Sequence, residues 1–152
     1  MFVGDPLFID VPLEKLLSKE YASEVSNKIK KNERTFINRV TQIEPKNTTH
    51  VSVIDQEGNC VTMTHSLGMP SGVITDGLGF MFNGCMAVFD PRPGRAGSIA
   101  PGKSRFSSLA PTIVTKDGNP HIVLGAPGGT QIAMGILQAI INVIDFDMTM
   151  LE

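Results

Sequence analysis

The sequence predicts an α+β fold, because two hairpin signals lie between two helical segments. Alternating runs on both sides of residues 56–59 predict a first hairpin over about 48–66, since period-two alternation is typical of β-strands. A second hairpin is expected over 112–125, across the turn residues 117–119. Helices are expected at about 13–31 and 130–144.

The first helix is indicated by apolar residues spaced by three and four. Pro12 suits the first turn of a helix, and the stripe then comprises Leu13, Leu16, Leu17, Tyr21, Val25 and Ile29. Residues 35–47 show no clear period. We therefore expect one helix from Leu13 to about Lys31, followed by a linker that leads to Thr48.

The middle and the end of the chain carry further signals. Residues 68–72 are expected to form a loop and residues 78–82 a short apolar strand. Residues 83–104 are expected to form a long ordered loop, and loops of this length are often functional. The segment 130–144 is apolar on nearly all faces, which is typical of a buried helix. It is expected to lie between a sheet and structure outside this chain.

Composition excludes several classes of protein. With 152 residues and a net charge of −2, the chain gives no reason to expect nucleic-acid binding. No apolar run reaches the ~20 residues that span a bilayer, and the start of the chain does not have the pattern of a signal peptide. The two cysteines, Cys60 and Cys85, have no metal-site spacing. No metal, cofactor or membrane contact is expected, and the cytoplasm is favoured over the periplasm or the exterior.

Thr48 is at the N-terminal end of the first predicted strand. A threonine there becomes a nucleophile if the preceding bond is cut, because the new α-amino group, with a pKa near ~7.7–8.0, can act as the base. A Thr-Thr pair at a strand start is otherwise explained by ordinary β-propensity. From these residues alone, both interpretations stay open.

Four blocks in a fixed order resemble the γ-glutamyltranspeptidase family of N-terminal-nucleophile (Ntn) hydrolases. They are residues 48–53, Asp55 with Gly58-Asn59, residues 107–114 and residues 125–130. The resemblance implies part of a four-layer αββα Ntn-hydrolase sandwich. Residues 1–47 would then be the C-terminal end of the large subunit, a helix plus linker. Residues 48–152 would be the small-subunit catalytic region, truncated at its C-terminus, with the remainder of the large subunit as partner in a heterodimer formed by self-cleavage.

The same resemblance implies roles around the nucleophile. Thr48, released by cleavage of the Asn47–Thr48 bond, would attack the substrate. Ser66 would supply the second hydroxyl that orients it, and Thr64, on the same strand face, could share that role. His50 and His65 are expected to be structural.

Further roles follow at the second hairpin and the helix after it. Gly128 and Gly129 lie at a strand-to-helix junction, where backbone N–H groups can form an oxyanion hole. Ser107 and Ser108 match the pair that grips the substrate's α-carboxylate in the family.

Cys85 and Val88 depart from the family pattern. They fall where γ-glutamyl-specific members carry polar groups that bind the substrate's ammonium, and neither side chain can pair with that charge. The resemblance therefore implies a γ-glutamyltransferase-like amidohydrolase or acyltransferase, related to glutathione hydrolases, that acts on a small-molecule γ-glutamyl or related amide. The alternatives are a cephalosporin-acylase-like enzyme, a poly-γ-glutamyl-processing enzyme, or an inactive fragment that needs a partner chain.

Overall fold

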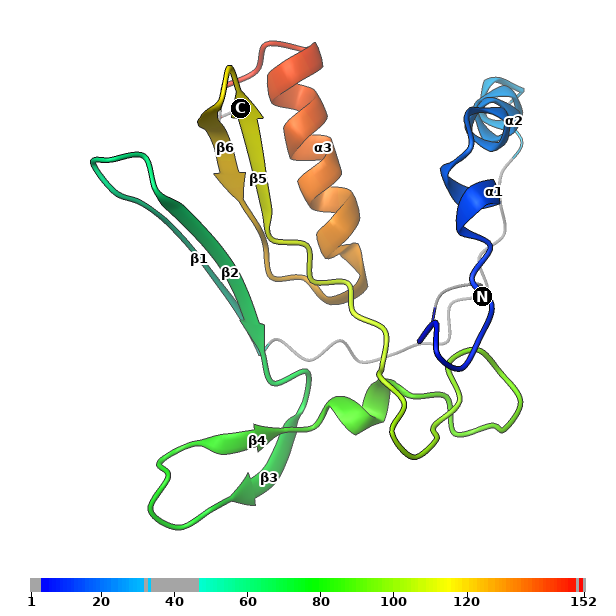
Figure 1. Ribbon diagram of the computed structural model, residues 1–152, viewed down its shortest axis with the longest axis vertical. Coiled ribbons are helices and arrows are strands. Elements are labelled where there is room, and N and C mark those ends of the chain that lie inside the picture. Colours follow the sequence, from blue (N-terminus) through cyan, green and yellow to red (C-terminus); the bar gives the residue numbers. More distant parts are fainter. Residues whose placement is uncertain (1–3, 32, 34–46, 150, 152) are drawn as a thin grey trace. The chain divides into compact units, whose positions relative to one another are not determined.

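The computed structural model describes residues 4–31, 33, 47–149 and 151 (Figure 1). These residues form two compact units. The first unit comprises the described residues among 1–43 and 88–106, and the second comprises those among 44–87 and 107–152. The described residues form a mixed α+β fold with three two-stranded antiparallel sheets, and the expected α+β class is confirmed at that level.

Two short helices occupy the first unit: α1 (Leu13–Leu17) and α2 (Lys19–Lys30). The prediction of one continuous helix was wrong, because Ser18 adopts an extended backbone and its hydroxyl accepts a hydrogen bond from Tyr21 N at 3.1 Å. A serine in that position caps a new helix. Neither helix contains a buried residue, and the predicted linker lies outside the described residues except for Asn47.

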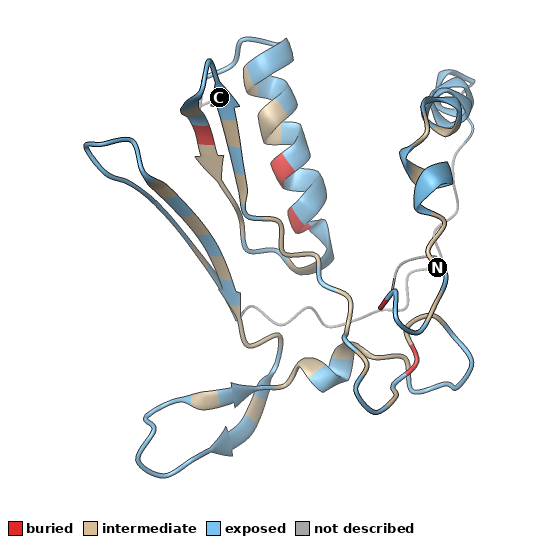
Figure 2. Cartoon of the chain, viewed as in Figure 1, coloured by how far each residue is buried: buried red, intermediate tan, exposed pale blue. Residues whose placement is uncertain are grey.

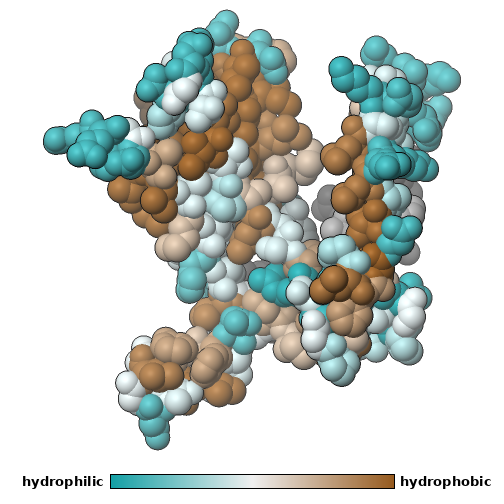
Figure 3. Space-filling view, in the orientation of Figure 1, coloured by the Kyte–Doolittle hydropathy of each residue, from teal (hydrophilic) through white to brown (hydrophobic). Residues whose placement is uncertain are grey.

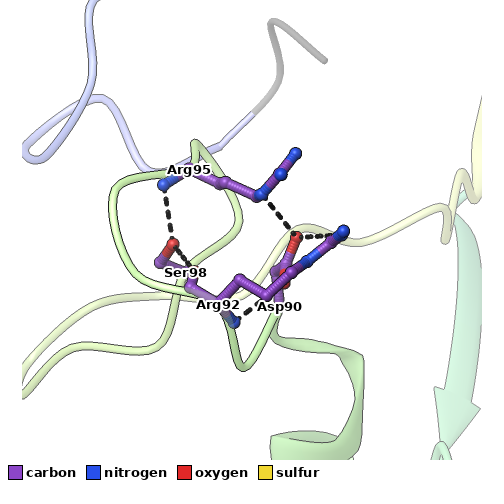
Figure 4. Close-up of polar contacts among 4 residues, drawn as sticks. All are labelled: Asp90, Arg92, Arg95 and Ser98. Carbon is purple, nitrogen blue, oxygen red and sulfur yellow. Dashed lines mark hydrogen bonds and ion pairs between the residues drawn. The ribbon is translucent and has the colours of Figure 1, made fainter.

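The loop over residues 88–106 is ordered by side chains that bind backbone groups. The buried Asp5 carboxylate accepts hydrogen bonds from Leu7 N at 2.9 Å and Ser104 N at 2.7 Å. The buried Ser98 hydroxyl accepts from Arg95 N at 2.8 Å and donates to the Arg92 carbonyl (Figure 4). These contacts are consistent with the ordered loop that the sequence predicts.

Asp90 adds an ion-pair cluster to the same loop. Its carboxylate accepts from Nε and Nη2 of Arg92, both at 2.8 Å, and lies 3.9 Å from Nε of Arg95 (Figure 4). The hydrogen bonds from Arg92 are the main reason that the pKa of Asp90 falls to about 2.

Two regular hairpins dominate the second unit. Strands β1 (Thr48–Ile54) and β2 (Cys60–Ser66) pair without interruption, and β5 (Thr112–Lys116) pairs with β6 (Asn119–Leu124). The register shifts between Val114 and Thr115, opposite Pro120, which has no N–H to donate. Both predicted hairpins are confirmed.

A third hairpin corrects the expectation for residues 68–82. Strand β3 (Pro70–Ile74) occupies much of the predicted loop, and β4 (Met81–Asn83) begins later than the predicted strand. The pairing is irregular and is supplemented by Ser71 Oγ, which donates to Phe82 O at 2.6 Å. Pro70 is tolerated because this two-stranded sheet has only edge strands. The 3-10 helix η1 (Cys85–Val88) follows.

The apolar core lies where the last helix follows the β5–β6 hairpin. A 3-10 turn, η2 (Gly129–Gln131), precedes α3 (Ile132–Asp145), and Figure 1 draws α3 beside this hairpin. Ile122 of β6 and Ile132 and Ile136 of α3 are buried, but other apolar residues of α3 are exposed: Met134, Leu137 and Ile144 (Figure 2). Within the described residues, only one face of the predicted buried helix is therefore covered.

Apolar side chains also gather at the surface of the second unit. The β3–β4 hairpin is largely brown in Figure 3, and its exposed residues include Val73, Ile74, Phe80 and Phe82. One face of the β1–β2 hairpin likewise exposes Val51, Val53, Val61 and Met63. None of the described helices is long and apolar enough to cross a membrane.

Candidate functional site

Thr48 and Ser66 are brought together by the register of the first hairpin. Thr48 begins β1, Ser66 ends β2, and the two residues are paired directly across the strands. Their hydroxyl oxygens lie 2.9 Å apart. The eighteen-residue spacing in the sequence thus becomes a direct hydrogen bond at the open end of the hairpin.

Ser66 also contacts the peptide bond in front of Thr48. Its hydroxyl donates to the carbonyl oxygen of Asn47 at 3.3 Å, and the backbone N–H of Leu67 donates to the same oxygen at 3.2 Å. Because a hydroxyl has one proton, the bond to Asn47 leaves Ser66 Oγ as the acceptor for the Thr48 hydroxyl. Ser66 Oγ further accepts from Gly68 N at 2.9 Å. One serine therefore connects the Thr48 hydroxyl to the carbonyl group of Asn47.

Thr64, which could share the role of Ser66, contacts a histidine ring. It lies opposite His50 in the register, and its hydroxyl contacts Nδ1 of that ring at 3.0 Å. The other ring nitrogen, Nε2, lies 2.9 Å from Ser52 Oγ and 3.2 Å from Thr62 Oγ1. These four side chains form a polar stripe on one face of the hairpin, which the sequence analysis did not identify. The sequence signal for this stripe is the period-two spacing of its His, Ser and Thr residues along both strands.

Gly128 and Gly129 lie at the predicted strand-to-helix junction after β6, where Gly128 precedes η2 and Gly129 is its first residue. Their φ angles are +142° and +58°, values that favour glycine. The carbonyl of Gly129 accepts a hydrogen bond from Ser108 Oγ at 2.6 Å. N–H groups at the start of a helical segment have no carbonyl partner within it, so they can bind an anion.

Ser107 and Ser108 differ in how their hydroxyls are used. The exposed Ser107 hydroxyl accepts from Leu109 N at 3.2 Å, which leaves its own proton available. The half-buried Ser108 donates its proton to Gly129 O. The structure therefore joins one member of the predicted serine pair to the predicted oxyanion loop.

Cys85 and Val88 belong to different units. Cys85 Sγ lies 3.6 Å from the carbonyl oxygen of Leu67 and packs against Gly68, where an added Cβ would lie 2.9 Å from the sulfur. Val88 lines a cavity of about 10 Å³ in the first unit together with Phe89 and Phe106. A larger cavity of about 450 Å³ in that unit is lined by none of the predicted site residues. Among the described residues, no group of three His, Cys, Asp or Glu side chains could hold a metal ion.

Comparison with known proteins gives matches over nearly the whole chain. The sequence profile described as Gamma-glutamyltranspeptidase matches residues 1–152. The chain is 41% identical over 152 residues to the Acylase ACY 1 proenzyme of Pseudomonas sp. (strain V22), covering 98% of this chain and 27% of that protein. It is 33% identical over 168 residues to the Glutathione hydrolase proenzyme of Escherichia coli (strain K12), covering 99% of this chain and 29% of that protein. It thus spans less than a third of either relative.

A solved structure is similar in both sequence and fold. Gamma-glutamyltranspeptidase from Pseudomonas nitroreducens, complexed with L-DON, superposes with a TM-score of 0.61 at 41% identity. The superposition covers 66% of this chain and 58% of that one. The resemblance drawn from the ordered sequence blocks is therefore confirmed: the chain belongs to the γ-glutamyltranspeptidase family.

Proposed function

We propose that this chain carries the catalytic core of an amidohydrolase or acyltransferase that first cuts its own Asn47–Thr48 bond and then uses Thr48 as nucleophile. The observation that carries the proposal is the position of Ser66, which bonds to the Thr48 hydroxyl at 2.9 Å and to the Asn47 carbonyl at 3.3 Å. This arrangement supports self-cleavage, because it holds the hydroxyl of Thr48 and the neighbouring carbonyl group on one shared hydroxyl.

In the first step the Thr48 oxygen attacks the Asn47 carbonyl carbon. The carbonyl oxygen gains negative charge, which the Ser66 hydroxyl and the Leu67 N–H are placed to stabilise. The hydroxyl proton of Thr48 ends on the Thr48 nitrogen, the C–N bond breaks and an ester forms. Water then hydrolyses the ester, which leaves Thr48 with a free α-amino group and a free hydroxyl.

In the second reaction the α-amino group takes the proton of the Thr48 hydroxyl, because its ordinary pKa of ~7.7–8.0 suits a base near neutral pH. The hydroxyl oxygen attacks the substrate amide, and the N–H groups of Gly128 and Gly129 stabilise the oxyanion. The α-amino group gives its proton to the leaving amine, the C–N bond breaks and an ester to Thr48 forms. Water or a second amine then cleaves this ester and releases the acyl group. Removing one such donor typically costs ~10²–10³ in turnover.

We assign Ser107 and Ser108 different roles. Ser107 keeps a free proton and would donate it to the substrate's carboxylate, whereas Ser108 would hold the Gly129 carbonyl and so the oxyanion loop. Ser107→Ala should mainly raise KM, and Ser108→Ala should mainly lower kcat, since oxyanion contacts act in the transition state. Equal KM and kcat effects in the two variants would contradict this division.

For the substrate, we propose an amide whose acyl group has no ammonium, because neither Cys85 nor Val88 can pair with that charge. The similarity to the Acylase ACY 1 proenzyme supports an acylase-like specificity. Cys85→Gln combined with Val88→Asp should shift preference toward γ-glutamyl donors. A parent enzyme that cleaves a γ-glutamyl anilide as well as its best non-glutamyl amide would refute this specificity.

We further propose the architecture that this chemistry needs. Residues 1–47 would end a large subunit, and residues 48–152 would form the catalytic region of a small subunit in a four-layer αββα sandwich. The exposed apolar residues of β1–β2 and α3 support packing against the remainder of that protein. A non-catalytic chain that only assembles with a partner is the competing hypothesis.

Intact-mass analysis of the full-length protein tests the proposal. The parent should appear as two pieces, one with Thr48 at its N-terminus, and Thr48→Ala should stay whole and inactive. Thr49→Ala is the matched control, because Thr49 is exposed and faces away from Ser66, and it should split normally. Ser66→Ala should slow cleavage strongly and Ser66→Thr should restore it. Cleavage of the Thr48→Ala protein at the same bond would exclude the mechanism.

A further inference from the structure

His50 lies between the two parts of the proposed site. It follows Thr48 by two residues and therefore lies on the same face of β1. Gly125 directly follows β6 and precedes Gly128 by three residues. All four residues belong to the second unit.

The His50 ring occupies the space where a side chain at residue 125 would lie. A Cβ built onto Gly125 would overlap Cε1 and Nδ1 of the ring and would lie 2.9 Å from Nε2. The φ angle of Gly125 is not among the positive values that favour glycine. Glycine is therefore required here by the close approach of the imidazole and not by the backbone conformation.

The ring cannot easily move aside, because both of its nitrogens have partners. Thr64 contacts Nδ1 at 3.0 Å, and Ser52 and Thr62 contact Nε2 at 2.9 and 3.2 Å. Thr62 also donates its proton to the carbonyl oxygen of Leu124 at 3.2 Å, so it can only accept from His50. The network thus assigns the proton to Nε2, with Nδ1 accepting from Thr64.

Two contacts consequently hold the end of β6 against the polar stripe of the first hairpin. Thr62 bonds to Leu124 O, and the His50 ring lies against Gly125. The loop that carries Gly128 and Gly129 begins at this point, where the end of β6 contacts the hairpin that carries Thr48. With both nitrogens occupied, His50 has no free site for accepting a proton from Thr48.

We propose that His50 is a positioning residue, which sets the distance between the Thr48 strand and the oxyanion loop by filling the space over Gly125. This inference rests on the proposed function of Thr48 and of Gly128 with Gly129. Because an oxyanion hole acts in the transition state, a displaced loop lowers kcat more than it changes KM. Misplacement of a site by about 1 Å can cost roughly 10²-fold in rate.

A double-mutant cycle in the full-length protein tests the contact. Gly125→Ala should lower kcat by roughly 10- to 100-fold with KM changed little, because the new methyl group pushes the loop away from the ring. His50→Ala should also lower kcat. In the His50→Ala background, the further change Gly125→Ala should cost less than about twofold, because the methyl group enters vacated space. Equal cost in both backgrounds would overturn the proposal.

Gly135→Ala is the matched control for the glycine change. Gly135 lies in α3 without a positive φ, and an added Cβ there meets nothing within 4 Å. It should leave kcat unchanged, and a Gly125→Ala enzyme that behaves like it would refute the inference. Thermal unfolding of the four cycle proteins provides a readout independent of activity. If Thr48 is not the nucleophile but the melting temperatures are still non-additive, then the proposed function fails while the His50–Gly125 contact stands.

Discussion

The two units of this chain are stabilised by different kinds of buried residue. In the described part of the second unit the buried side chains are apolar: Ile122 and Ile132 are 2% exposed and Ile136 is 4% exposed. In the described part of the first unit they are polar: Asp5 is 7% exposed and Ser98 is 8% exposed (Figure 2).

This difference separates two physical mechanisms. Burial of an isoleucine is non-directional, and its contribution follows the apolar area and volume that fill the space. The contributions of Asp5 and Ser98 depend on particular donors and acceptors, and that of Asp5 also on charge. In the second unit, the loss of unfolding free energy on substitution should therefore follow the side-chain volume that is removed. In the first unit, it should follow the hydrogen bonds that are lost.

The largest effect is expected from Ile132→Ala in α3. Truncating a buried isoleucine typically costs about 2–5 kcal/mol of unfolding free energy, because transfer and cavity terms add. Ile144→Ala, on the same helix but 50% exposed, should cost much less. Urea denaturation of the full-length protein measures both changes, and similar costs would mean that the apolar core has been located wrongly.

Ser98→Ala should have the next largest effect, of about 1–3 kcal/mol, because it leaves Arg95 N and the Arg92 carbonyl without their partner. Ser98→Thr retains the hydroxyl and should recover part of the loss. Amide hydrogen exchange at Arg95 reports on the loop directly and should accelerate in the alanine variant. Unchanged exchange there would show that the hydroxyl does not stabilise the loop.

Asp5→Asn should weaken the first unit in a pH-dependent way. The hydrogen bonds from Ser104 N and then Leu7 N lower the pKa of Asp5 below its ordinary 3.8. The stabilisation is therefore present above about pH 4 and is lost as the pH falls through the lowered pKa. Thermal unfolding between pH 2 and 6 should lose this acid dependence in Asp5→Asn but keep it in the exposed control Asp10→Asn.

The smallest effect is expected from Asp90→Asn, because the partners Arg92 and Arg95 are exposed and solvent screens the ion pairs. The pKa of Asp90 is about 2, so its contribution is complete above about pH 4 and disappears as the pH falls toward 2. Titration of the side-chain carboxyl by NMR should give this low value. A value near 3.8 would show that the Arg92 contact does not persist in solution.

Local patterns in the sequence were enough to predict the hairpins and the last helix, whereas the contact of Thr48 with Ser66 was implied by the family resemblance. Alternation with period two and a turn at residues 56–59 determine which residues face each other across a hairpin. Thr48 and Ser66, eighteen residues apart in the sequence, are therefore paired in the register. The helix break at Ser18 and the strand at Pro70 were missed, because a capping hydroxyl and an edge-strand proline leave the surrounding periodicity ambiguous.

Contacts between distant segments were decided by the tertiary structure alone. Asp5 binds the amide of Ser104, and the His50 ring lies against Gly125. Periodicity reports which face of an element a residue occupies, but it contains no information on which other element covers that face. The sequence by itself therefore determined the family, the hairpin registers and the nucleophile candidate, whereas packing of one hairpin on another decided why residue 125 is glycine and where His50 lies.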